Sequence, residues 1–382
     1  MRRYRLLTAA LLLAGCGNKM DLPVETPGGS IPFDGYFVYG VWENVGNVTD
    51  ILVTENQWVY LAEDSVAVTR YKRKGANVDG VIVARAIGSL PGLGRPVYLD
   101  EGMEDHIFIV DLETDTLPVP PNNVESRLLL VPTVKLFDLY SEEFTESWRD
   151  AAWTPLDSFY RYPGRDSAKS IRYLHDFTAT GVGADGEDRV YVAGRSFSYT
   201  ERVLRHYEGG VVTSRDTSWS DSSTTWSVMK YESDGTPAGE AAGDGTGLGY
   251  GRGIHRVALS PDYLYFVDGG TNRVKINNRA GESAGVEWLD GTEIGEAAEA
   301  LPFDLIPSGL GVDVRGQLYV SDGGNHRVLK YTSQFRYKER VDKNEIGLLG
   351  APAAIAATDS LVYVFDEAGP RIVLFELPAP AE

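Results

Sequence analysis

A repeated pattern of short apolar runs constrains the fold of this chain more than any other feature of its sequence. Residues 309–331 read G-L-G-V-D-V-R-G-Q-L-Y-V-S-D-G-G-N-H-R-V-L-K-Y, with two apolar runs around an Arg-Gly turn and a third run after Asp-Gly-Gly-Asn. Residues 254–277 repeat this order, and residues 354–375 repeat it in part. Alternating apolar positions between tight Asp/Gly turns are typical of β-meanders. Such a repeat sets the architecture before any single residue is considered.

The number of units follows from weaker copies of the same pattern. These copies lie at residues 50–62, 96–111 and 182–193, and together with the three better copies they make six units. A further strand-like run follows most third strands, for example at residues 337–341. Six four-stranded antiparallel units of about 45 residues predict an all-β fold, the six-bladed β-propeller, in which radial repetition leaves only short protected edges.

The turns of the better copies resemble those of the NHL-repeat family. The shared features are the Asp-Gly-Gly turn and the Arg that follows it, seen at Asp268–Arg273 and Asp322–Arg327. The resemblance is close for units four and five, fair for unit six and loose for units one to three, and it covers most of residues 36–377. It implies a propeller scaffold but no particular activity, because one fold hosts many functions.

The last unit lacks a fourth strand. Its apolar runs end near Phe375, and only a few residues follow. Tyr36–Trp42 is a strand-like run that belongs to no unit. We therefore expect Tyr36–Trp42 to pair with the last blade as its outer strand and to close the ring, which would also remove an open sheet edge.

The first residues of the chain predict export and lipid anchoring. A basic start, Met1–Arg5, precedes an apolar stretch of about ten residues, which is too short to span a bilayer and is typical of a signal peptide. The sequence Leu13-Ala14-Gly15-Cys16 resembles a bacterial lipobox, which implies cleavage before Cys16 and acylation of its thiol and new amine. Several acyl chains would make the anchoring stable. The alternative is an ordinary signal peptide with an accidental cysteine, and Cys16 is the single cysteine of the chain.

This interpretation divides the chain into four parts. They are a signal peptide at residues 1–15, a lipidated cysteine with a flexible tether at 16–34, the propeller at 35–377 and a tail at 378–382. The tether would span on the order of 20 Å. The predicted location is the bacterial cell envelope, with a lipid anchor. Gly17 rather than Asp follows the cysteine, which favours the outer membrane over the inner membrane by the rule for enteric lipoproteins.

The charge of the chain excludes some partners. The formal net charge is −19, and removal of the three arginines of the signal peptide takes it to −22. This balance argues against nucleic acid and against adsorption of the protein to anionic lipid. Solubility of an exported protein is a sufficient explanation of the charge.

Three insertions interrupt the repeat, at about residues 112–133, 149–176 and 194–225. Their positions relative to the strands predict that all three emerge on one propeller face over blades two and three. Long loops on a rigid scaffold often bind partners, and exposed Tyr and Trp are typical anchors. The alternative is that the aromatic residues pack together as a small satellite core. The candidate partner-binding residues are Trp153, Tyr160, Tyr162, Phe197, Tyr199 and Trp219.

Catalytic motifs are missing from the sequence. It contains no G-x-S-x-G elbow, its one cysteine is assigned to lipid, and none of its five histidines forms H-E-x-x-H. His175, His255 and His326 fall near the insertion face and are the candidate ligands if the central channel binds a metal, as in some six-bladed relatives. A structural role in its turn is the preferred interpretation of His326. No cofactor is predicted.

Acidic and basic residues also recur across the turns between second and third strands. The pairs are Asp268 with Arg273, Asp322 with Arg327 and Asp366 with Arg371. Because they recur once per repeat, we expect each Asp to cap its turn and each Arg to pair with a nearby carboxylate, rather than to form a ring of binding groups.

The sequence therefore predicts a membrane-anchored envelope lipoprotein. Its propeller would be a non-enzymatic scaffold that binds a protein or an envelope polymer such as a polysaccharide through the insertion-bearing face. The alternative is a metal-dependent lyase or lactone hydrolase, with Ca²⁺ or Zn²⁺ held at the central channel by side chains from three or more blades.

Overall fold

The computed structural model describes residues 35–43, 45–56, 58–63, 66–78, 81–102, 106–119, 125–149, 154–161, 167–208, 211–221, 225–243, 253–279, 283–291 and 305–377. Gly35–Leu377 forms one compact unit, and the second unit, Met1–Asp34 with Pro378–Glu382, lies outside the described residues. The predicted signal peptide, Cys16, the tether and the tail lie there too. Within the described ranges, no helix has the length and apolar character needed to cross a membrane.

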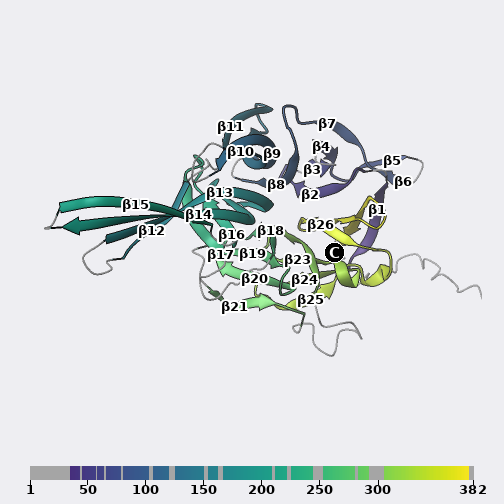
Figure 1. The fold of residues 1–382 in the computed structure, drawn as a ribbon. Coiled ribbons are helices and arrows are strands. Elements are labelled where there is room, and N and C mark those ends of the chain that lie inside the picture. The colour runs from purple at the N-terminus through teal and green to yellow at the C-terminus, as the bar shows by residue number, and fades with distance from the viewer. Residues whose placement is uncertain are drawn as a thin grey trace, which may run out of the picture. The chain divides into compact units, whose positions relative to one another are not determined.

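Gly35–Leu377 is an all-β, six-bladed propeller of antiparallel blades, as the repeat predicts (Figure 1). Blade one consists of β2 (Val48–Val53), β3 (Trp58–Glu63), β4 (Ala67–Lys72) and β7 (Ala86–Ser89). Blade two consists of β8 (Pro96–Glu101), β9 (His106–Val119), β10 (Glu125–Asp138) and β11 (Glu143–Arg149). Blade three consists of β13 (Ser167–Ala184), β14 (Val190–Glu208), β16 (Thr225–Tyr231) and β17 (Pro237–Gly243), and carries the additional strands β12 (Thr154–Arg161) and β15 (Val211–Asp221).

The second half of the ring follows the repeat most closely. Blade four consists of β18 (Ile254–Leu259), β19 (Tyr263–Asp268), β20 (Arg273–Asn278) and β21 (Ser283–Leu289). Blade five consists of β22 (Pro307–Val312), β23 (Leu318–Asp322), β24 (Arg327–Tyr331) and β25 (Tyr337–Arg340). Blade six consists of β26 (Pro352–Ala357), β27 (Leu361–Asp366), β28 (Arg371–Glu376) and β1 (Phe37–Glu43). A small separate sheet pairs β5 (Ala76–Val78) with β6 (Val81–Val83), and the described residues include short 3-10 turns at η2 (Gly323–Asn325) and η3 (Lys343–Glu345).

The second strands of blades four to six form the most buried part of the propeller. β19, β23 and β27 read Y-L-Y-F-V-D, L-Y-V-S-D and L-V-Y-V-F-D, and all their residues except Tyr263 are buried. Aromatic and β-branched side chains suit such strands because they pack on both faces of the sheet. The turns that follow need left-handed backbone, which Asn272 and His326 adopt at φ values of 54° and 55°.

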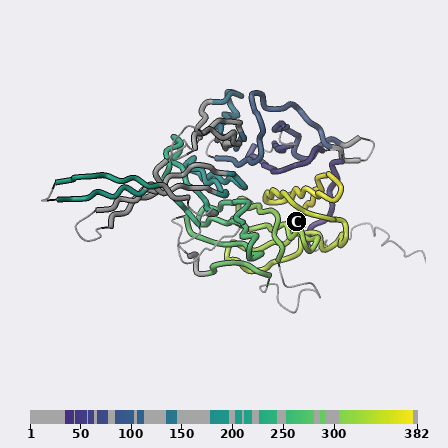
Figure 2. Tube along the Cα trace, viewed as in Figure 1, coloured from purple at the N-terminus to yellow at the C-terminus, as the bar shows by residue number. Residues whose placement is uncertain are grey.

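The N-terminal strand completes the last blade. β1 pairs antiparallel with β28, from Phe37 opposite Glu376 to Glu43 opposite Arg371. Figures 1 and 2 show purple β1 beside the yellow C-terminal strands. This is the pairing that ring closure by residues 36–42 requires.

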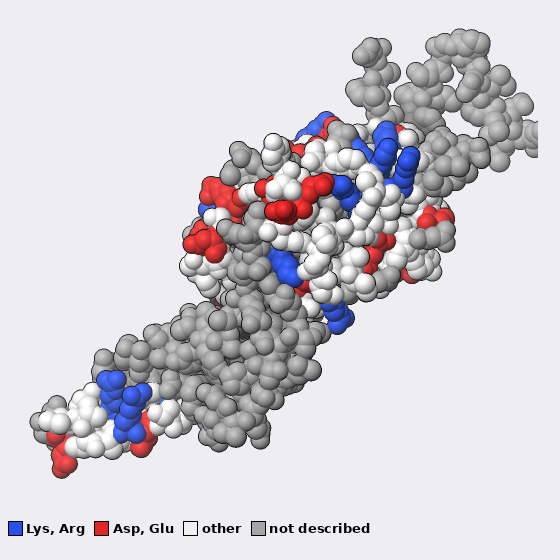
Figure 3. Space-filling model, turned by 90° about the horizontal axis from the view of Figure 1, so that it is seen from above, with Lys and Arg blue, Asp and Glu red and all other residues white. Residues whose placement is uncertain are grey.

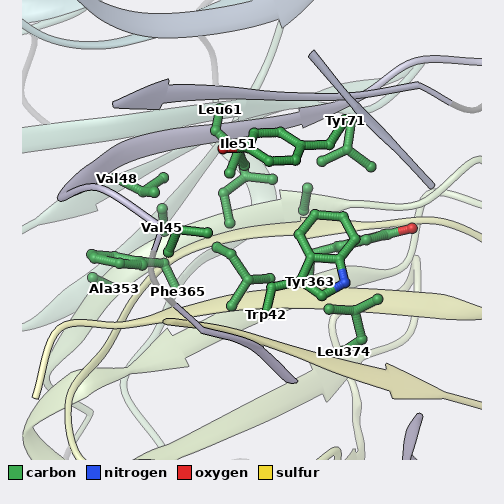
Figure 4. Packing of buried hydrophobic residues seen from close by; sticks show 14 of the residues in the cluster. Trp42, Val45, Val48, Ile51, Leu61, Tyr71, Ala353, Tyr363, Phe365 and Leu374 are labelled. Atoms are coloured by element: carbon green, nitrogen blue, oxygen red, sulfur yellow. The ribbon is translucent and has the colours of Figure 1, made fainter. Parts of the chain in front are cut away.

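Trp42 of β1 anchors this closing strand in the core between blades six and one (Figure 4). The indole is fully buried, stacks on Tyr71 of blade one at 5.6 Å between ring centroids, and meets Tyr363 of blade six at 5.9 Å. The residue before the strand, Tyr36, is tied to blade five, since its hydroxyl lies 2.9 Å from the Tyr319 hydroxyl. The start of the propeller therefore packs against three blades.

The described parts of the insertions are strands, which corrects the expectation of long loops. Residues 112–119 and 125–133 extend β9 and β10 as one hairpin. Within 149–176, β12 pairs with the first half of β13, and within 194–225, β14 continues and pairs with β15. The polar composition of residues 213–221 concealed this strand, because its outer positions are filled by Ser, Thr, Arg and Asp rather than by apolar residues.

Candidate functional site

The additional strands of blade three form a four-stranded sheet that we call the arm. It consists of β12, residues 167–176 of β13, residues 196–208 of β14, and β15, paired in the order β12-β13-β14-β15. Figure 1 shows these strands extending away from the blades. Both β13 and β14 continue from the blade into the arm, and their pairing shifts register between Leu174 and Asp176, where the arm begins.

β14 changes its partner where it leaves the blade. From Val190 to Ser196 it pairs with β16, and from Tyr199 to Glu208 it pairs with β15. Burial changes at the same point. Residues 190–194 are buried, whereas Val203 is the one buried side chain among those described at residues 202–208. The described side chains of the outer arm, at residues 202–208 and 211–218, are therefore mostly exposed to solvent.

The arm contains four of the six aromatic residues predicted to bind a partner. Tyr160 lies on β12, Phe197 and Tyr199 lie on β14, and Trp219 lies on β15. The side chains of these four residues are not among those described. Trp153 and Tyr162 lie outside the described residues altogether. The partner-binding assignment of all six remains a prediction.

A basic cluster on the outer half of the arm was missed by the sequence analysis. Arg202 and Arg205 on β14 and Arg215 on β15 are exposed, and Arg205 lies directly opposite Arg215 in the strand register. Figure 3 shows blue side chains at the lower left, toward the end of this part of the molecule. Strand pairing was needed to find the cluster, because Arg205 and Arg215 lie in separate runs of the sequence.

The central channel opens on the arm-bearing face through a cavity of about 360 Å³. Its lining includes Tyr98, Thr180, His255, Arg256 and Ser308 from the first strands of blades two to five, and it also includes Glu367. Two of the lining side chains contain nitrogen, those of His255 and Arg256, and both belong to β18. This mouth therefore combines hydrogen-bond donors from several blades in one place.

Arg256 crosses the channel and links the first strands of four blades. Its Nη1 donates to Thr49 O at 2.5 Å, its Nε donates to Ser308 O at 3.3 Å, and its guanidinium lies 5.4 Å from the centre of the Tyr98 ring. The backbone of Arg256 is left-handed at φ 56°, which is uncommon for a residue with a side chain. Gly181 of β13 permits the close approach of this backbone, because a Cβ there would lie 2.7 Å from Arg256 Cα.

The candidate metal ligands do not share one environment. His255 is partly buried at the channel mouth, where its Nδ1 lies 2.9 Å from Gly253 O. Burial lowers the pKa of His255, and the Arg256 charge lowers it further. His326 is exposed and ends the short turn η2, in keeping with the structural role preferred for it. The side chain of His175 on β13 is not described.

A larger cavity of about 700 Å³ occupies the other end of the channel. The first strands of all six blades contribute to its lining, which includes the carboxyl groups of Asp50, Asp100 and Asp359. Within the part of the chain that the structure describes, no cluster of three or more His, Cys, Asp or Glu residues has a geometry suited to a metal ion.

Two carboxyl groups of this cavity link neighbouring first strands. Asp50 on β2 accepts a hydrogen bond from Leu99 N at 3.0 Å, and Asp100 on β8 accepts one from Ala184 N at 2.6 Å. Burial raises the pKa of Asp50 to about 6, although the Arg256 charge opposes the rise. Burial also raises the pKa of Asp100 to about 7, and hydrogen bonds from Ala184 N and Glu101 N oppose that rise. These carboxyls were not singled out from the sequence, since they look like ordinary strand residues.

The recurring acidic and basic pairs stabilise the turns of the arm-bearing face. Asp322 and Arg327 are fully buried and form an ion pair at 2.7 Å, while Asp322 also accepts from Ile306 N at 2.7 Å. Asp366 pairs with Arg371 at 3.0 Å. In each of these two blades, one carboxylate thus binds both the third strand and the segment that precedes the first strand.

Blade four varies this arrangement. Asp268 caps its own turn by accepting from Gly270 N at 3.1 Å and from Thr271 Oγ1 at 2.8 Å. Arg273 lies 3.7 Å from Asp290 and 4.5 Å above the Trp288 ring. In each blade the groups are engaged within the protein, as expected for a structural role.

Comparison with known proteins identifies the repeat in blade five. Residues 305–331 match the family model of the NHL repeat, which covers the first three strands of this blade. No curated protein matches the chain.

Solved structures of similar fold are distant in sequence. The PQQ-bound aldose sugar dehydrogenase from Streptomyces coelicolor is 11% identical, with a TM-score of 0.46, over 89% of this chain and 97% of that chain. A catalytically inactive virginiamycin B lyase from Staphylococcus aureus with quinupristin is 12% identical, with a TM-score of 0.39, over 88% of this chain and 82% of that chain. The WD40 β-propeller domain of Doa1 is 8% identical, with a TM-score of 0.44, over 91% of this chain and 98% of that chain. At these identities the likeness concerns the fold alone.

Proposed function

We propose that this protein is a non-enzymatic binding scaffold of the bacterial cell envelope, attached to a membrane through an acylated Cys16. Its propeller would bind a protein or an envelope polymer on the arm-bearing face. The observation that supports this proposal is the arm itself. Its strands continue those of blade three, its side chains described at residues 202–208 and 211–218 are mostly exposed, and it contains Tyr160, Phe197, Tyr199 and Trp219.

The position of the arm suits a binding role. The arm and the channel mouth formed by His255 and Arg256 share strand β13. Residues 167–176 of β13 belong to the arm, and Thr180 lines the mouth. A partner that contacts the arm therefore also faces the mouth. Sites built on strands hold their side chains more accurately than sites on free loops. The scaffold therefore offers an extended surface and a polar recess on the same face.

Deletion of the arm hairpin tests this proposal. Replacing residues 196–225 by Asn-Gly would join Arg195 to Trp226, which are opposite each other in the register of β14 and β16. Partners cross-linked to the full-length protein in intact envelopes would be identified for the parent and for this variant. We expect the variant to lose the partners that depend on the arm, while its thermal unfolding remains cooperative.

A matched control removes a hairpin elsewhere. Deletion of residues 76–83, which contain β5 and β6 of the separate two-stranded sheet, shortens the protein without touching the arm. The same partners should remain bound to this control. An unchanged partner set after removal of the arm hairpin would contradict the proposal.

Lipid anchoring is tested separately at Cys16. We expect metabolic labelling with a palmitate analogue to mark the parent and not the Cys16→Ala variant, and density-gradient fractions to show the labelled protein in the outer membrane. Label in both proteins, or in neither, would contradict acylation at this residue.

Metal analysis tests the non-enzymatic part of the proposal. The full-length protein would be purified without chelator and analysed for Ca²⁺ and Zn²⁺. A tightly bound metal in stoichiometric amount would support a metal-dependent lyase or lactone hydrolase at the channel instead. We expect no such metal.

A further inference from the structure

The outer end of the arm exposes adjacent apolar side chains. Val211 and Val212 open β15 with 67% and 44% of their surfaces accessible, whereas the other large exposed hydrophobic residues of the described chain stand singly. Val212 lies opposite the half-buried Tyr207 in the register of β14 and β15. Two neighbouring exposed valines beside a tyrosine form an apolar tip at the outer end of the described part of the arm.

Arginines stand directly behind this tip. Arg205 and Arg215 occupy opposite positions of the two strands, and both are exposed. Like charges at opposite positions destabilise a sheet, so the fold gains nothing from this pairing. In the part of the chain that the structure describes, neither residue takes part in an ion pair, in contrast to the arginines of the blades.

The spacing of the two features matches the interface of a bilayer. Arg205 precedes Tyr207, the residue opposite Val212, by two positions, which corresponds to about 7 Å along a strand. Groups that lie at a membrane surface place their apolar part about 5–10 Å into the boundary between headgroups and acyl chains. When Val211 and Val212 enter this boundary, Arg205 and Arg215 stand at the level of the lipid phosphates.

We propose that the tip of the arm, residues 202–208 and 211–216, docks on the surface of a bilayer that contains anionic phospholipid. Val211 and Val212 insert into the interface, and Arg205 and Arg215 bind headgroup phosphates. The net charge of −19 keeps the body of the protein away from such a surface, so contact is confined to the tip. Glu208 and Asp216 oppose binding, and Asp216 is held by His206 at 3.0 Å. This inference does not depend on a protein partner or on acylation.

Vesicle flotation with purified components tests the proposal. The mature chain, residues 16–382 with Cys16→Ser, has neither the basic and apolar signal segment nor a thiol to acylate, and it would be mixed with phosphatidylcholine vesicles with and without phosphatidylglycerol. We expect binding to the anionic vesicles only, and weaker binding as salt is raised. Equal binding to both kinds of vesicle, or to neither, would overturn the proposal.

Two tip variants and two matched controls assign the binding to the tip. Arg205→Gln with Arg215→Gln removes the charges, and Val211→Ser with Val212→Ser removes the apolar groups. Each is expected to reduce vesicle binding on the order of tenfold. The controls are Arg315→Gln with Arg336→Gln, at exposed arginines of blade five, and Val66→Ser with Val314→Ser, at valines that are 68% and 75% exposed. Binding by the tip variants at the strength of the controls would overturn the assignment.

An acidic polymer is the alternative ligand for Arg205 and Arg215. Soluble polyglutamate would be tested with the same proteins. Binding of polyglutamate through Arg205 and Arg215, without binding to anionic vesicles, would assign the tip to an acidic polymer and overturn docking on lipid. Vesicles contain no partner protein, so the absence of vesicle binding would not contradict the scaffold proposal. Likewise, an unchanged set of cross-linked partners would not contradict docking on lipid.

Discussion

Blade five and the arm are both antiparallel sheets, but they are stabilised in different ways. Every residue of β23 and β24 is buried, whereas all described side chains of β15 are exposed. The blade packs between two neighbours, so its stability comes from buried apolar surface. In the described outer part of the arm, residues 202–208 and 211–218, Val203 is the one buried side chain. Substitutions at these exposed arm residues therefore cost less stability than substitutions in the blade, which leaves the arm residues available for binding.

Charged groups show the same contrast. In blade five, Arg327 pairs with Asp322 and Arg340 pairs with Asp342 at 2.6 Å, and all four side chains are buried. In the arm, exposed Arg205 lies opposite Arg215. A like-charged pair in an acidic protein is unfavourable for folding but suits the binding of an anion. The comparison supports the proposal that the blades are the stable frame and that the arm binds a partner.

The largest effect is expected at the buried ion pair of blade five. Asp322→Ala removes the partner of a fully buried guanidinium together with the acceptor for Ile306 N. Breaking one side of a buried pair costs about 3–5 kcal/mol, so we expect a loss of unfolding free energy near the upper end of this range in urea titrations. Arg273→Leu in blade four is the control, because its side chain is 34% exposed, and it should cost under about 1 kcal/mol. Equal losses would show that the buried pair is not what stabilises the blade.

A slightly smaller effect is expected where the N-terminal strand joins the ring. Trp42→Ala leaves a cavity between Tyr71 and Tyr363, and truncation of a buried Trp costs about 3–5 kcal/mol. Hydrogen exchange should show faster opening of β1 and β28 than of β23. The half-buried Trp58 provides the control, and Trp58→Ala should cost clearly less. A similar cost for both would contradict a special role of Trp42 in closing the ring.

The sequence predicted the blades because their determinants are local. The Asp-Gly-Gly turns place left-handed backbone at fixed positions, and the missing strand of the last unit pointed to residues 36–42. The arm was not predicted, since its strands have polar outer positions and depend on pairing between segments far apart in the chain. Arg256 was also missed, because its contact with Thr49 spans 207 residues. Only the folded ring brings such groups together in one channel.

An intermediate effect is expected for the channel carboxyls of Asp50 and Asp100, which are only partly buried and lack a cation as close as those of the blade pairs. The folded-state pKa values of Asp50 and Asp100 are about 6 and about 7, above the ordinary value of 3.8. The folded protein therefore holds protons that the unfolded chain releases. Their stabilising contribution is complete below about pH 4 and is lost as pH rises through 6 and 7.

Asp100→Asn tests this pH dependence. The amide keeps an acceptor for Ala184 N without the cost of a buried charge, so the variant should be more stable than the parent by about 1–2 kcal/mol at pH 8 and similar to it at pH 4. Urea titrations at both pH values measure the difference. Asp359→Asn is the control, because its carboxyl lines the same cavity but is 52% exposed, and it should show little change at either pH. A variant that is less stable than the parent at pH 8 would contradict the assigned sign.

The smallest effect on stability is expected at the tip of the arm, where the effect on binding should be largest. Val211→Ser and Arg215→Gln change exposed side chains, and such substitutions usually alter unfolding free energy by less than about 0.5 kcal/mol. Arg215→Gln should even stabilise β14 and β15 slightly, since it removes a like charge opposite Arg205. Thermal unfolding of the purified variants checks this, with vesicle flotation on the same samples. A loss of stability comparable to that of Trp42→Ala would mean that the arm belongs to the frame, and the division between stable blades and interacting arm would no longer hold.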